Sequence, residues 1–462
     1  MNIILIVSDT FRYDNLFDRA AMPVRTPELD RFSGRAVSME NCWVASYPTI
    51  PHRTDLTTGR VGWPWHRWQS RHASSRNHAP EVLRKAGYVS QLLCDCPHLF
   101  KADFDQGFDG AQVVRGQEGD TYFVRMNYPI KEIVPLEKTR PTGRMNARGL
   151  PNLSSWINRN WRAGVEEDRF APRTARLAVE WLEENYQHED LFLWVDFFDP
   201  HEPWDPPEYR VKRYDPDYAG TPMTHPNYGR ASDYTPAELK NLRAHYCAEA
   251  EMVDRSVGRI LQKIDDLSLW KDSIVVFTTD HGMFLGEHGC TGKSNINPGD
   301  DRWWPLYPEI AHIPLMIAAP GLEGGRAMDA FVQPPDILPT LLDLAGVEAA
   351  PPEPFHGKSF APMLRGEAQP SLHEFVVSAS YLRAKDGAIP PKVVTPAVYT
   401  REWAYVPIGQ EGKRELYDLK GDPGAERDLS AKHPEVVKEM HAKLLAYLKE
   451  LGAPNEAVEV FR

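Results

Sequence analysis

The stretch Ile3-Ile4-Leu5-Ile6-Val7, which runs directly into Ser8 and Asp9, decides the fold of this chain. Five consecutive aliphatic residues without polar alternation are typical of a strand that is buried on both faces of a mostly parallel sheet. The same kind of run recurs at residues 191–195 and 273–277. We therefore expect three buried strands within one sheet.

Polar residues follow each of these strands. Asp9 follows the first strand, Asp196 and Asp199-Pro200-His201 follow the second, and Thr278-Thr279-Asp280-His281 follow the third. Ligands of open α/β sheets bind outside the carboxyl ends of the strands, where neighbouring parallel strands bring their ends together. Asp9, Asp280 and His281 could therefore supply oxygen and imidazole ligands to one divalent metal. The same residue types are also common in caps and turns, so the spacing alone leaves both interpretations open.

Helical patterns lie between the strands, at residues 172–186 and 236–267. This alternation predicts an α/β fold with a large mixed, mostly parallel sheet sandwiched by helices. Residues 115–170 are too long and too weakly periodic for a simple connection, so we expect an insertion that serves as a lid, an arm or an oligomer contact.

The pattern changes after about residue 370. Short strand-like runs at residues 375–379, 402–406 and 415–418 precede a helical pattern at 434–451. The expected organisation is therefore a large domain over residues 1–369 and a small α+β subdomain over residues 370–462.

Composition and charge limit the function. Hydrophobic residues make up 42% and charged residues 26% of the 462 residues, which is ordinary globular usage. The net charge of -12 argues against a nucleic-acid or anionic-membrane surface, and no apolar run is long enough to span a membrane. The five scattered cysteines fit free thiols in a reducing compartment. We expect a cytoplasmic protein that binds neither nucleic acid nor membrane, and the insertion is compatible with a homo-oligomer.

Residues 49–60 read Thr-Ile-Pro-His-Arg-Thr-Asp-Leu-Thr-Thr-Gly-Arg. The segment places the hydroxyl of Thr49, a proline turn and Arg53 at the start of a helical pattern. A helix N-terminus presents free N–H groups and the positive end of a dipole, which together suit an oxyanion. An anionic substrate is therefore expected here.

This segment resembles the signature of the sulfatase family within the alkaline phosphatase superfamily, C/S-x-P-S-R followed after four residues by T-G. Thr49, Pro51, Arg53, Thr58 and Gly59 fall in that frame. Further matches follow in the family's order along most of the chain: Ser8-Asp9-Thr10 with Arg12 and Asp14, Asp199-Pro200-His201-Glu202-Pro203-Trp204, Glu251-Met252-Val253-Asp254, Thr279-Asp280-His281-Gly282, Gly286-Glu287-His288-Gly289, Lys293, Glu309, and Leu416-Tyr417-Asp418-Leu419. The resemblance implies an alkaline phosphatase-like fold and a metal-dependent ester hydrolase.

The chain also departs from the family pattern. Thr49 stands where sulfatases carry a Cys or Ser that is oxidised to formylglycine, and Thr49 is not expected to undergo that conversion. Its hydroxyl is similar to the threonine nucleophiles of phosphodiesterases and phosphoethanolamine transferases in the same superfamily. His52 replaces the signature Ser, Thr10 replaces a second Asp, and Asp95-Cys96-Pro97-His98 replaces a basic K-W-H segment.

The resemblance assigns a role to each candidate residue. Thr49 is the expected nucleophile, Arg53 and Lys293 spread the developing charge, and His201 and His288 are the candidate acid and base. Substrate contacts are expected from His98, His52 and Trp204. The expected metal ligands are Asp9, Thr49, Asp280 and His281, which would hold one divalent ion. This set favours manganese or zinc and also allows calcium or magnesium.

The implied activity is hydrolysis of a small anionic ester. Our main expectation is a phosphate or phosphonate ester, either a diester or a phosphonate monoester, hydrolysed through Thr49. Sulfate ester hydrolysis without formylglycine is the alternative within the same chemistry. The alternative from another class is an inactive homologue that binds a metal and a ligand.

Overall fold

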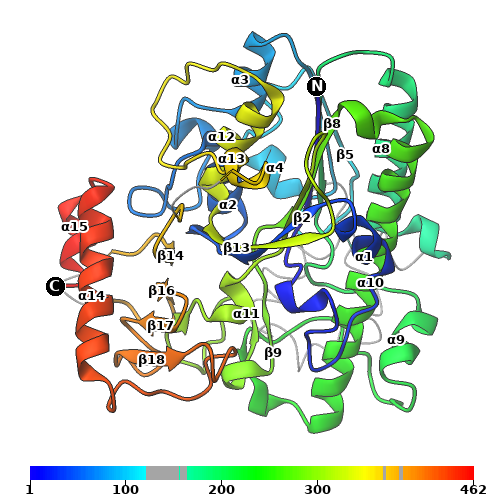
Figure 1. Cartoon of the computed structure of the whole chain (residues 1–462). Helices are drawn as coiled ribbons and strands as arrows, with labels where there is room; N and C mark the ends of the chain where they lie inside the picture. Colours follow the sequence, from blue (N-terminus) through cyan, green and yellow to red (C-terminus); the bar gives the residue numbers. More distant parts are fainter. Residues whose placement is uncertain (121–155, 157–163, 368–370, 384–388) are drawn as a thin grey trace.

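The computed structural model of the protein describes residues 1–120, 156, 164–367, 371–383 and 389–462 (Figure 1). Its centre is an eight-stranded sheet. All neighbouring pairs in this sheet are parallel except those of β12, which runs antiparallel to both of its neighbours. In spatial order the strands are β13 (Arg326–Val332), β2 (Val37–Cys42), β12 (Leu315–Ala318), β8 (Ser273–Thr279), β1 (Asn2–Ser8), β6 (Leu191–Phe197), β4 (Val89–Cys94) and β5 (Gly110–Val113).

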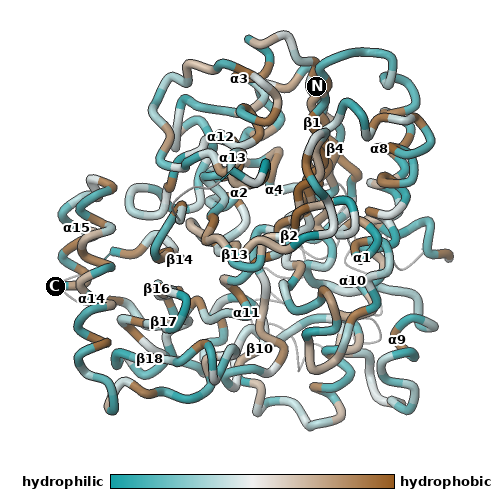
Figure 2. The backbone as a smooth tube through the Cα atoms, viewed as in Figure 1, coloured by the Kyte–Doolittle hydropathy of each residue, from teal (hydrophilic) through white to brown (hydrophobic). Residues whose placement is uncertain are grey.

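Strand β1 is buried on both faces, as its uninterrupted apolar sequence predicts. Ile3, Leu5 and Val7 pack into one hydrophobic cluster, while Ile4 and Ile6 pack into another on the opposite face. Figure 2 shows the central strands as the most hydrophobic part of the trace. The two clusters pack against opposite faces of the sheet and so hold its carboxyl edge in place.

One face of the sheet is covered by three helices. They are α1 (Pro27–Ser33), α8 (Phe170–Asn185) and α10 (Pro236–Asp266). Helix α10 begins with a capping box, in which Thr235 and Glu238 satisfy each other's backbone N–H groups. Ala175 and Leu182 of α8 pack with Val253 of α10 against this face.

Helices on the opposite face include α2 (Thr49–Thr58) and α12 (Pro334–Ala345), which Figure 1 shows on the other side of the central strands from α8 and α10. Helix α2 packs against α12, and Ile50 and Ile337 belong to the same hydrophobic cluster. The remaining helices are short except α14: α3 (Ala79–Lys85), α4 (Pro97–Lys101), α9 (Glu208–Tyr214), α11 (Pro308–Ala311), α13 (Ala361–Leu364), α14 (Pro434–Glu450) and α15 (Asn455–Glu459).

A second, five-stranded sheet joins the C-terminal region to the segment before α2. Its order is β18 (Glu415–Asp418), β17 (Trp403–Val406), β16 (Ala397–Tyr399), β14 (Val376–Ser380) and β3 (Ser46–Tyr47). Helix α14 covers this sheet, and Leu444 packs with Val377 and Tyr405 in its core. Only Pro48 separates β3 from Thr49, and β3 pairs with β14, so this sheet crosses the boundary expected at residue 369.

Five shorter strands complete the described elements. Strands β7 (Gly229–Arg230), β10 (Cys290–Gly292) and β9 (Phe284–Leu285) form one small sheet, and β11 (Trp304–Pro305) pairs with β15 (Val394–Thr395).

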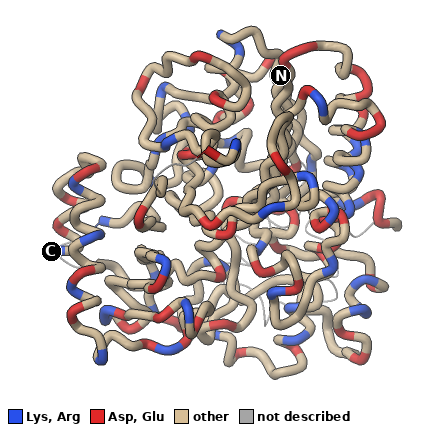
Figure 3. Tube along the Cα trace, in the orientation of Figure 1, with Lys and Arg blue, Asp and Glu red and all other residues tan. Residues whose placement is uncertain are grey.

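The structure confirms the predicted α/β fold with a mixed, mostly parallel sheet. Most of the expected insertion at residues 115–170 lies outside the described residues. The described cysteines are all buried free thiols. Among the described residues, none of the helices is both long and apolar enough to cross a membrane. Figure 3 shows acidic and basic residues interspersed along the outer helices, including α14.

Candidate active site

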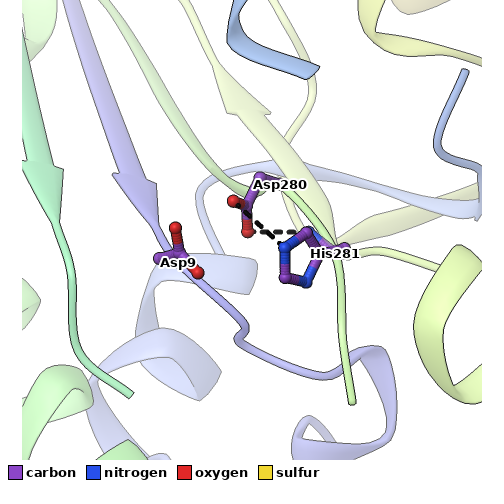
Figure 4. A group of neighbouring side chains, drawn as sticks. All are labelled: Asp9, Asp280 and His281. Carbon is purple, nitrogen blue, oxygen red and sulfur yellow. Dashed lines mark hydrogen bonds and ion pairs between the residues drawn. The ribbon is translucent and has the colours of Figure 1, made fainter. Parts of the chain in front are cut away.

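Asp9, Asp280 and His281 meet at the carboxyl edge of the central sheet. Strands β1 and β8 are parallel neighbours in a register that pairs Ser8 with Thr279, so the residues that follow them emerge side by side. Each of the three side chains offers one potential metal-ligand atom, and these three atoms all lie within 4.8 Å of one another. Figure 4 shows the three side chains, which are completely buried.

Helix α2 brings Thr49, His52 and Arg53 to the same edge. These residues stand at positions i, i+3 and i+4, so they share one face of the helix. The Arg53 Nη1 atom donates to Asp280 Oδ2 at 2.6 Å and to the Thr49 carbonyl at 3.2 Å. The guanidinium therefore fixes the first turn of α2 beside the acidic group.

Asp196, at the end of β6, completes the environment of Arg53. The Nε and Nη2 atoms of Arg53 each donate to an oxygen of Asp196 at 2.8 Å, which is a bidentate pair. Asp9 Oδ2 lies 3.4 Å from Nη1. Because Arg53 is fully buried among three carboxylates, its placement favours charge balance and positioning over direct contact with a substrate.

Burial and neighbouring charges perturb the pKa values of this group. Burial, with the nearby charge of Asp280, raises the pKa of Asp9 well above its usual value. Burial alone would raise the pKa of Asp280, but His281 and Arg53 outweigh it and hold that pKa well below the usual range. Burial lowers the pKa of His281 to about 4. At neutral pH the imidazole of His281 is therefore uncharged and has a lone pair available.

Two buried atoms of this group make no hydrogen bond to the described residues: Asp9 Oδ2 and His281 Nε2. Burying a polar atom without a hydrogen-bond partner costs free energy. Two such atoms in one group therefore indicate that a bound ion or molecule pairs with them. Two carboxylates and one imidazole form a donor set that suits a divalent cation. Asp9, Asp280 and His281 fit such an ion, and Thr49 lies on the turn of α2 that Arg53 ties to Asp280.

His201 and Lys293 lie on the side of the site that faces Glu202. Lys293 Nζ donates to Glu202 Oε2 at 3.3 Å, and His201 Nδ1 lies 3.6 Å from the same oxygen. The charge of Lys293 acts on both Asp9 and His281. Lys293 is therefore near enough to the cluster of Asp9, Asp280 and His281 for its charge to act there, and His201 contacts the Glu202 residue that Lys293 binds.

Comparison with known proteins agrees with this geometry. A profile of the family described as "Sulfatase" matches residues 1–347, and one described as "N-sulphoglucosamine sulphohydrolase, C-terminal" matches residues 299–450. The chain belongs to the sulfatase family. It is thus a hydrolase of the alkaline phosphatase superfamily, as the signature around Thr49 predicts.

Relatives of this sulfatase-family chain are distant. Arylsulfatase K of Homo sapiens is 23% identical over 473 residues, covering 96% of this chain and 81% of that relative. An arylsulfatase of Clostridium perfringens (strain 13 / Type A) is 23% identical over 458 residues, covering 91% of this chain and 88% of the relative.

Two solved structures share the fold of this chain over nearly its whole length. The phosphonate monoester hydrolase of Agrobacterium radiobacter has a TM-score of 0.72 at 21% identity and covers 97% and 96% of the two chains. A protein solved with its substrate D-glucosamine-2-N,6-O-disulfate has the same TM-score at 18% identity and covers 99% of each chain.

His288 belongs to a different group of side chains. Its Nε2 atom lies 3.1 Å from Glu309 Oε2, and its ring stacks on Tyr307 at 3.9 Å between centroids. Glu426, from the C-terminal region, lies near the same pair. Of the predicted acid–base pair, His201 therefore lies with Lys293 at Glu202. His288 lies instead with Glu309 and Glu426, where the C-terminal region meets the rest of the chain.

The three expected substrate contacts occupy different environments. His98, in α4, is partly exposed and packs edge-to-face against Trp68. His52 is fully buried, and neither of its ring nitrogens has a hydrogen bond within the described residues. Trp204 is also fully buried, donates its indole N–H to the Pro200 carbonyl at 2.7 Å, and packs in the core. Trp204 also lines a cavity with Arg169, Asp205 and His245, so its role as a substrate contact stays a prediction.

Sequence reasoning missed Asp196 and Glu202 as members of the site. Asp196 lies near the end of a buried strand, as Asp9 does, so its position in the sequence could have identified it as a site residue. Glu202 lies inside the matched segment 199–204, but nothing in its spacing shows that it holds Lys293 and His201.

Proposed function

We propose that this sulfatase-family protein hydrolyses singly charged anionic esters, first of all sulfate monoesters, with Thr49 as the nucleophile. The observation that carries the proposal is the convergence of the start of α2 with Asp9, Asp280 and His281 at one sheet edge. The activity named for the arylsulfatase relatives supports the choice of a sulfate ester.

The formal charges of the site favour an ester with one negative charge. Four buried carboxylates, two cationic side chains and a divalent cation would balance to about zero; the side chains are Asp9, Asp196, Glu202, Asp280, Arg53 and Lys293. A phosphate monoester carries close to two negative charges at neutral pH. Bringing that charge into a buried, neutral site costs more than bringing the single charge of a sulfate monoester.

In the first step, the Thr49 Oγ atom attacks sulfur in line with the ester oxygen. The bond between sulfur and that oxygen breaks. The proton of the Thr49 hydroxyl passes to one of His201 and Lys293 in its uncharged form, and the leaving alkoxide takes a proton from the other. Arg53 holds the first turn of α2, so that the hydroxyl stays aligned. The products of this step are an alcohol and a sulfated Thr49.

In the second step, water attacks the same sulfur and displaces the Thr49 oxygen. The group that protonated the alkoxide in the first step accepts a proton from the water, and the group that took the Thr49 proton returns it to the released Thr49 oxygen. A divalent cation bound by Asp9, Asp280 and His281 supplies Lewis-acid chemistry, which lowers the pKa of a nearby hydroxyl and withdraws charge from the ester. Sulfate leaves and the free hydroxyl is restored.

Phosphonate monoesters and phosphate diesters are the second candidate substrates. They too carry one negative charge, and two observations favour them: Thr49 has an unmodified hydroxyl, and a histidine takes part in the metal-type cluster. The fold likeness to a phosphonate monoester hydrolase agrees with this candidate without establishing it.

The test is a panel of 4-nitrophenyl esters assayed on metal-loaded protein. We expect turnover of 4-nitrophenyl sulfate, and also of 4-nitrophenyl phenylphosphonate or bis(4-nitrophenyl) phosphate if the second candidate holds. Thr49→Ala should lower kcat at least ~10³-fold, as expected for loss of a nucleophile, while Thr49→Ser should retain much of the rate. Mass spectrometry of quenched wild-type protein should find one added sulfuryl or phosphoryl group on residue 49.

Two results would contradict the proposal. Undiminished turnover by Thr49→Ala would exclude this nucleophile, and a preference for 4-nitrophenyl phosphate would contradict the charge argument. If protein shown to contain metal turned over none of these esters, an inactive ligand-binding homologue would be the better explanation.

A further inference from the structure

Trp68 is an exposed tryptophan in the segment that follows α2. Its side chain is 43% exposed, whereas Trp63, Trp194 and Trp304 are almost completely buried. Among the described residues, no other tryptophan is counted with the exposed large hydrophobic side chains. Exposing an indole ring has a free-energy cost, and exposed aromatic rings are typical of surfaces that bind a ligand.

A continuous series of ring contacts links Trp68 to His201. The Trp68 and His98 rings meet edge-to-face with centroids 5.3 Å apart. His98 contacts Phe198 at 5.8 Å, and Phe198 stacks on His201 at 3.9 Å with an angle of 22° between the planes. The rings therefore form one packed wall that extends from the surface inward.

The inner end of this wall lies at the catalytic group. His201 and Lys293 share Glu202, and the charge of Lys293 acts on Asp9. The backbone explains this placement. Helix α4, which carries His98, begins immediately after β4, and β4 is a parallel neighbour of β6, which carries Asp196 into the site.

The outer end of the wall is held in place by loops. Trp68 lies between α2 and the short helical turn Arg71–Ala73, whose Arg71 N–H donates to the Ala102 carbonyl at the end of α4. Gly119 approaches His98 from the other side, and a Cβ atom on Gly119 would lie 3.3 Å from the His98 ring. The segment that carries Trp68 is thus tied to α4, and Trp68 contacts His98 while much of it stays exposed.

We propose that Trp68 is a specificity-determining residue that packs on the ring of the ester's leaving group. The favoured substrate class is an ester whose leaving group is a ring with an apolar face, either an aryl ring or a pyranose. This inference rests on the proposed function, because it places the oxyanion at Thr49 and Lys293 and the ring further out along the wall.

The test measures binding separately from turnover, using metal-loaded full-length protein that carries Thr49→Ala, so that the proposed hydrolysis does not consume the ligands. Phenyl sulfate, glucose 6-sulfate and methyl sulfate present the same anion on an aryl ring, a pyranose and no ring, and calorimetry gives the Kd of each. Trp68→Ala should raise the Kd of phenyl sulfate about 3- to 10-fold, the range expected for one lost ring contact, and leave methyl sulfate unchanged. Trp68→Phe should retain most of the affinity. The glucose 6-sulfate measurement decides whether a pyranose is accepted as well.

Tyr186→Ala is the matched control, because Tyr186 is a similarly exposed aromatic residue at the end of α8. This variant should leave all three Kd values unchanged. The inference is overturned if Trp68→Ala weakens phenyl and methyl sulfate equally, if it weakens neither, or if the Thr49→Ala protein with Trp68 intact binds none of the three.

The two proposals fail in distinguishable ways. Binding of phenyl sulfate that depends on Trp68, without turnover of any 4-nitrophenyl ester, would refute the proposed hydrolysis alone. Turnover of 4-nitrophenyl sulfate with a phenyl sulfate Kd that is unaffected by Trp68→Ala would refute the role of Trp68 alone.

Discussion

Arg53 is the residue on which the geometry of the site depends most. One buried guanidinium faces Asp9, Asp196 and Asp280, and the same side chain bonds the Thr49 carbonyl. Removing one member of such a buried network leaves the others with uncompensated charge, which costs more than the loss of an exposed ion pair. The network therefore stabilises the fold while it holds the turn of α2 that carries Thr49, the proposed nucleophile.

Substitution of Asp196 tests this network. Asp196→Asn should lower the free energy of unfolding by about 3 kcal/mol, because Arg53 loses its bidentate partner in the protein interior. Asp14→Asn, at a more exposed pair with Arg12, should cost less than about 1 kcal/mol. Urea denaturation measures both values, and equal losses would show that burial does not set the strength of the Arg53 network.

Metal content distinguishes the two groups of potential ligands. Asp280→Asn should abolish stoichiometric binding of Mn²⁺ or Zn²⁺ after dialysis, because it removes a charged ligand from the group with Asp9 and His281. Glu309→Gln, in the second group with His288 and Glu426, should leave that stoichiometry unchanged. Elemental analysis of the dialysed proteins gives the answer, and retention of metal by Asp280→Asn would exclude the proposed centre.

At the scale of elements, the two ends of helix α2 are set by different contacts. Arg53 fixes the first turn. Asp55 accepts hydrogen bonds from the N–H groups of Ser46 in β3 and Gly62 in the loop after α2, and these bonds tie the helix to both segments. The helix ends at Gly59, whose φ of 66° lies in the left-handed region. The signature glycine is therefore required by backbone geometry rather than by chemistry.

Substituting Gly59 should be more costly than substituting a comparable glycine elsewhere. A Cβ atom at Gly59 would lie 2.5 Å from the Phe355 ring, in addition to the strain of a positive φ, so Gly59→Ala should lower stability by about 2 to 4 kcal/mol. Gly346 ends α12 with a φ of 69° and open space around it, so Gly346→Ala should cost about 1 kcal/mol. Thermal unfolding separates the steric effect from the conformational one, and similar values for both variants would contradict the predicted clash.

The contact between α1 and α10 predicts a pH dependence. Asp254 of α10 accepts bonds from the N–H groups of Glu28 and Leu29 at the start of α1, and burial raises the pKa of Asp254 to about 7. In the unfolded chain this carboxyl titrates near 4, as a model Asp does at about 3.9. The stabilisation associated with its bound proton is therefore complete below about pH 4 and is lost as the pH rises through 7.

Asp254→Asn should remove this part of the pH dependence. Between pH 4 and pH 8 the wild type should lose about 1 to 4 kcal/mol of stability that the variant keeps. The Tm of the variant relative to that of the wild type should therefore rise with pH. Asp266→Asn, on an exposed turn of the same helix, should leave the pH profile unchanged. A difference that shifts in the opposite direction would mean that the charged form of Asp254 stabilises the fold.

At the scale of the whole molecule, the sequence predicted the strands that carry the site with little error. The apolar runs at residues 3–7, 191–195 and 273–277 became β1, β6 and β8, each extended by one or two residues. Uninterrupted apolar runs predict buried strands well because burial on both faces leaves no polar alternation to misread. Asp9, Asp280 and His281 came together for the same reason, since they follow neighbouring strands.

Contacts between distant parts of the chain could not be predicted in this way. Glu202, which holds both Lys293 and His201, and the pairing of His288 with Glu309 depend on how loops fold back onto the sheet. The burial of Trp204 is a similar case, because an aromatic residue in a motif can equally belong to a pocket or to the core. The expected boundary at residue 369 did not anticipate β3, a two-residue strand that is too short to give a sequence pattern.

Truncation tests whether residues 1–369 form an independent unit. Ala45, Val61 and Trp63 pack in the same core as Val377 and Tyr405, so a fragment ending at residue 369 would expose an apolar face and leave β3 unpaired. We expect this fragment to aggregate or to lack a cooperative thermal transition, while the full chain shows one. A soluble fragment with a cooperative transition and full metal content would instead support two autonomous domains.

The pairing of β3 with β14 has a consequence for biosynthesis. The two residues that lead into the nucleophile are made early, but the strand that fixes them, Val376–Ser380, emerges from the ribosome more than 300 residues later. During translation the segment before Thr49 therefore lacks its native neighbour, and the proposed site can take its final form only after residues 376–380 have left the exit tunnel. A nascent chain stalled before that point would carry every residue of the predicted site and still be incompetent for catalysis.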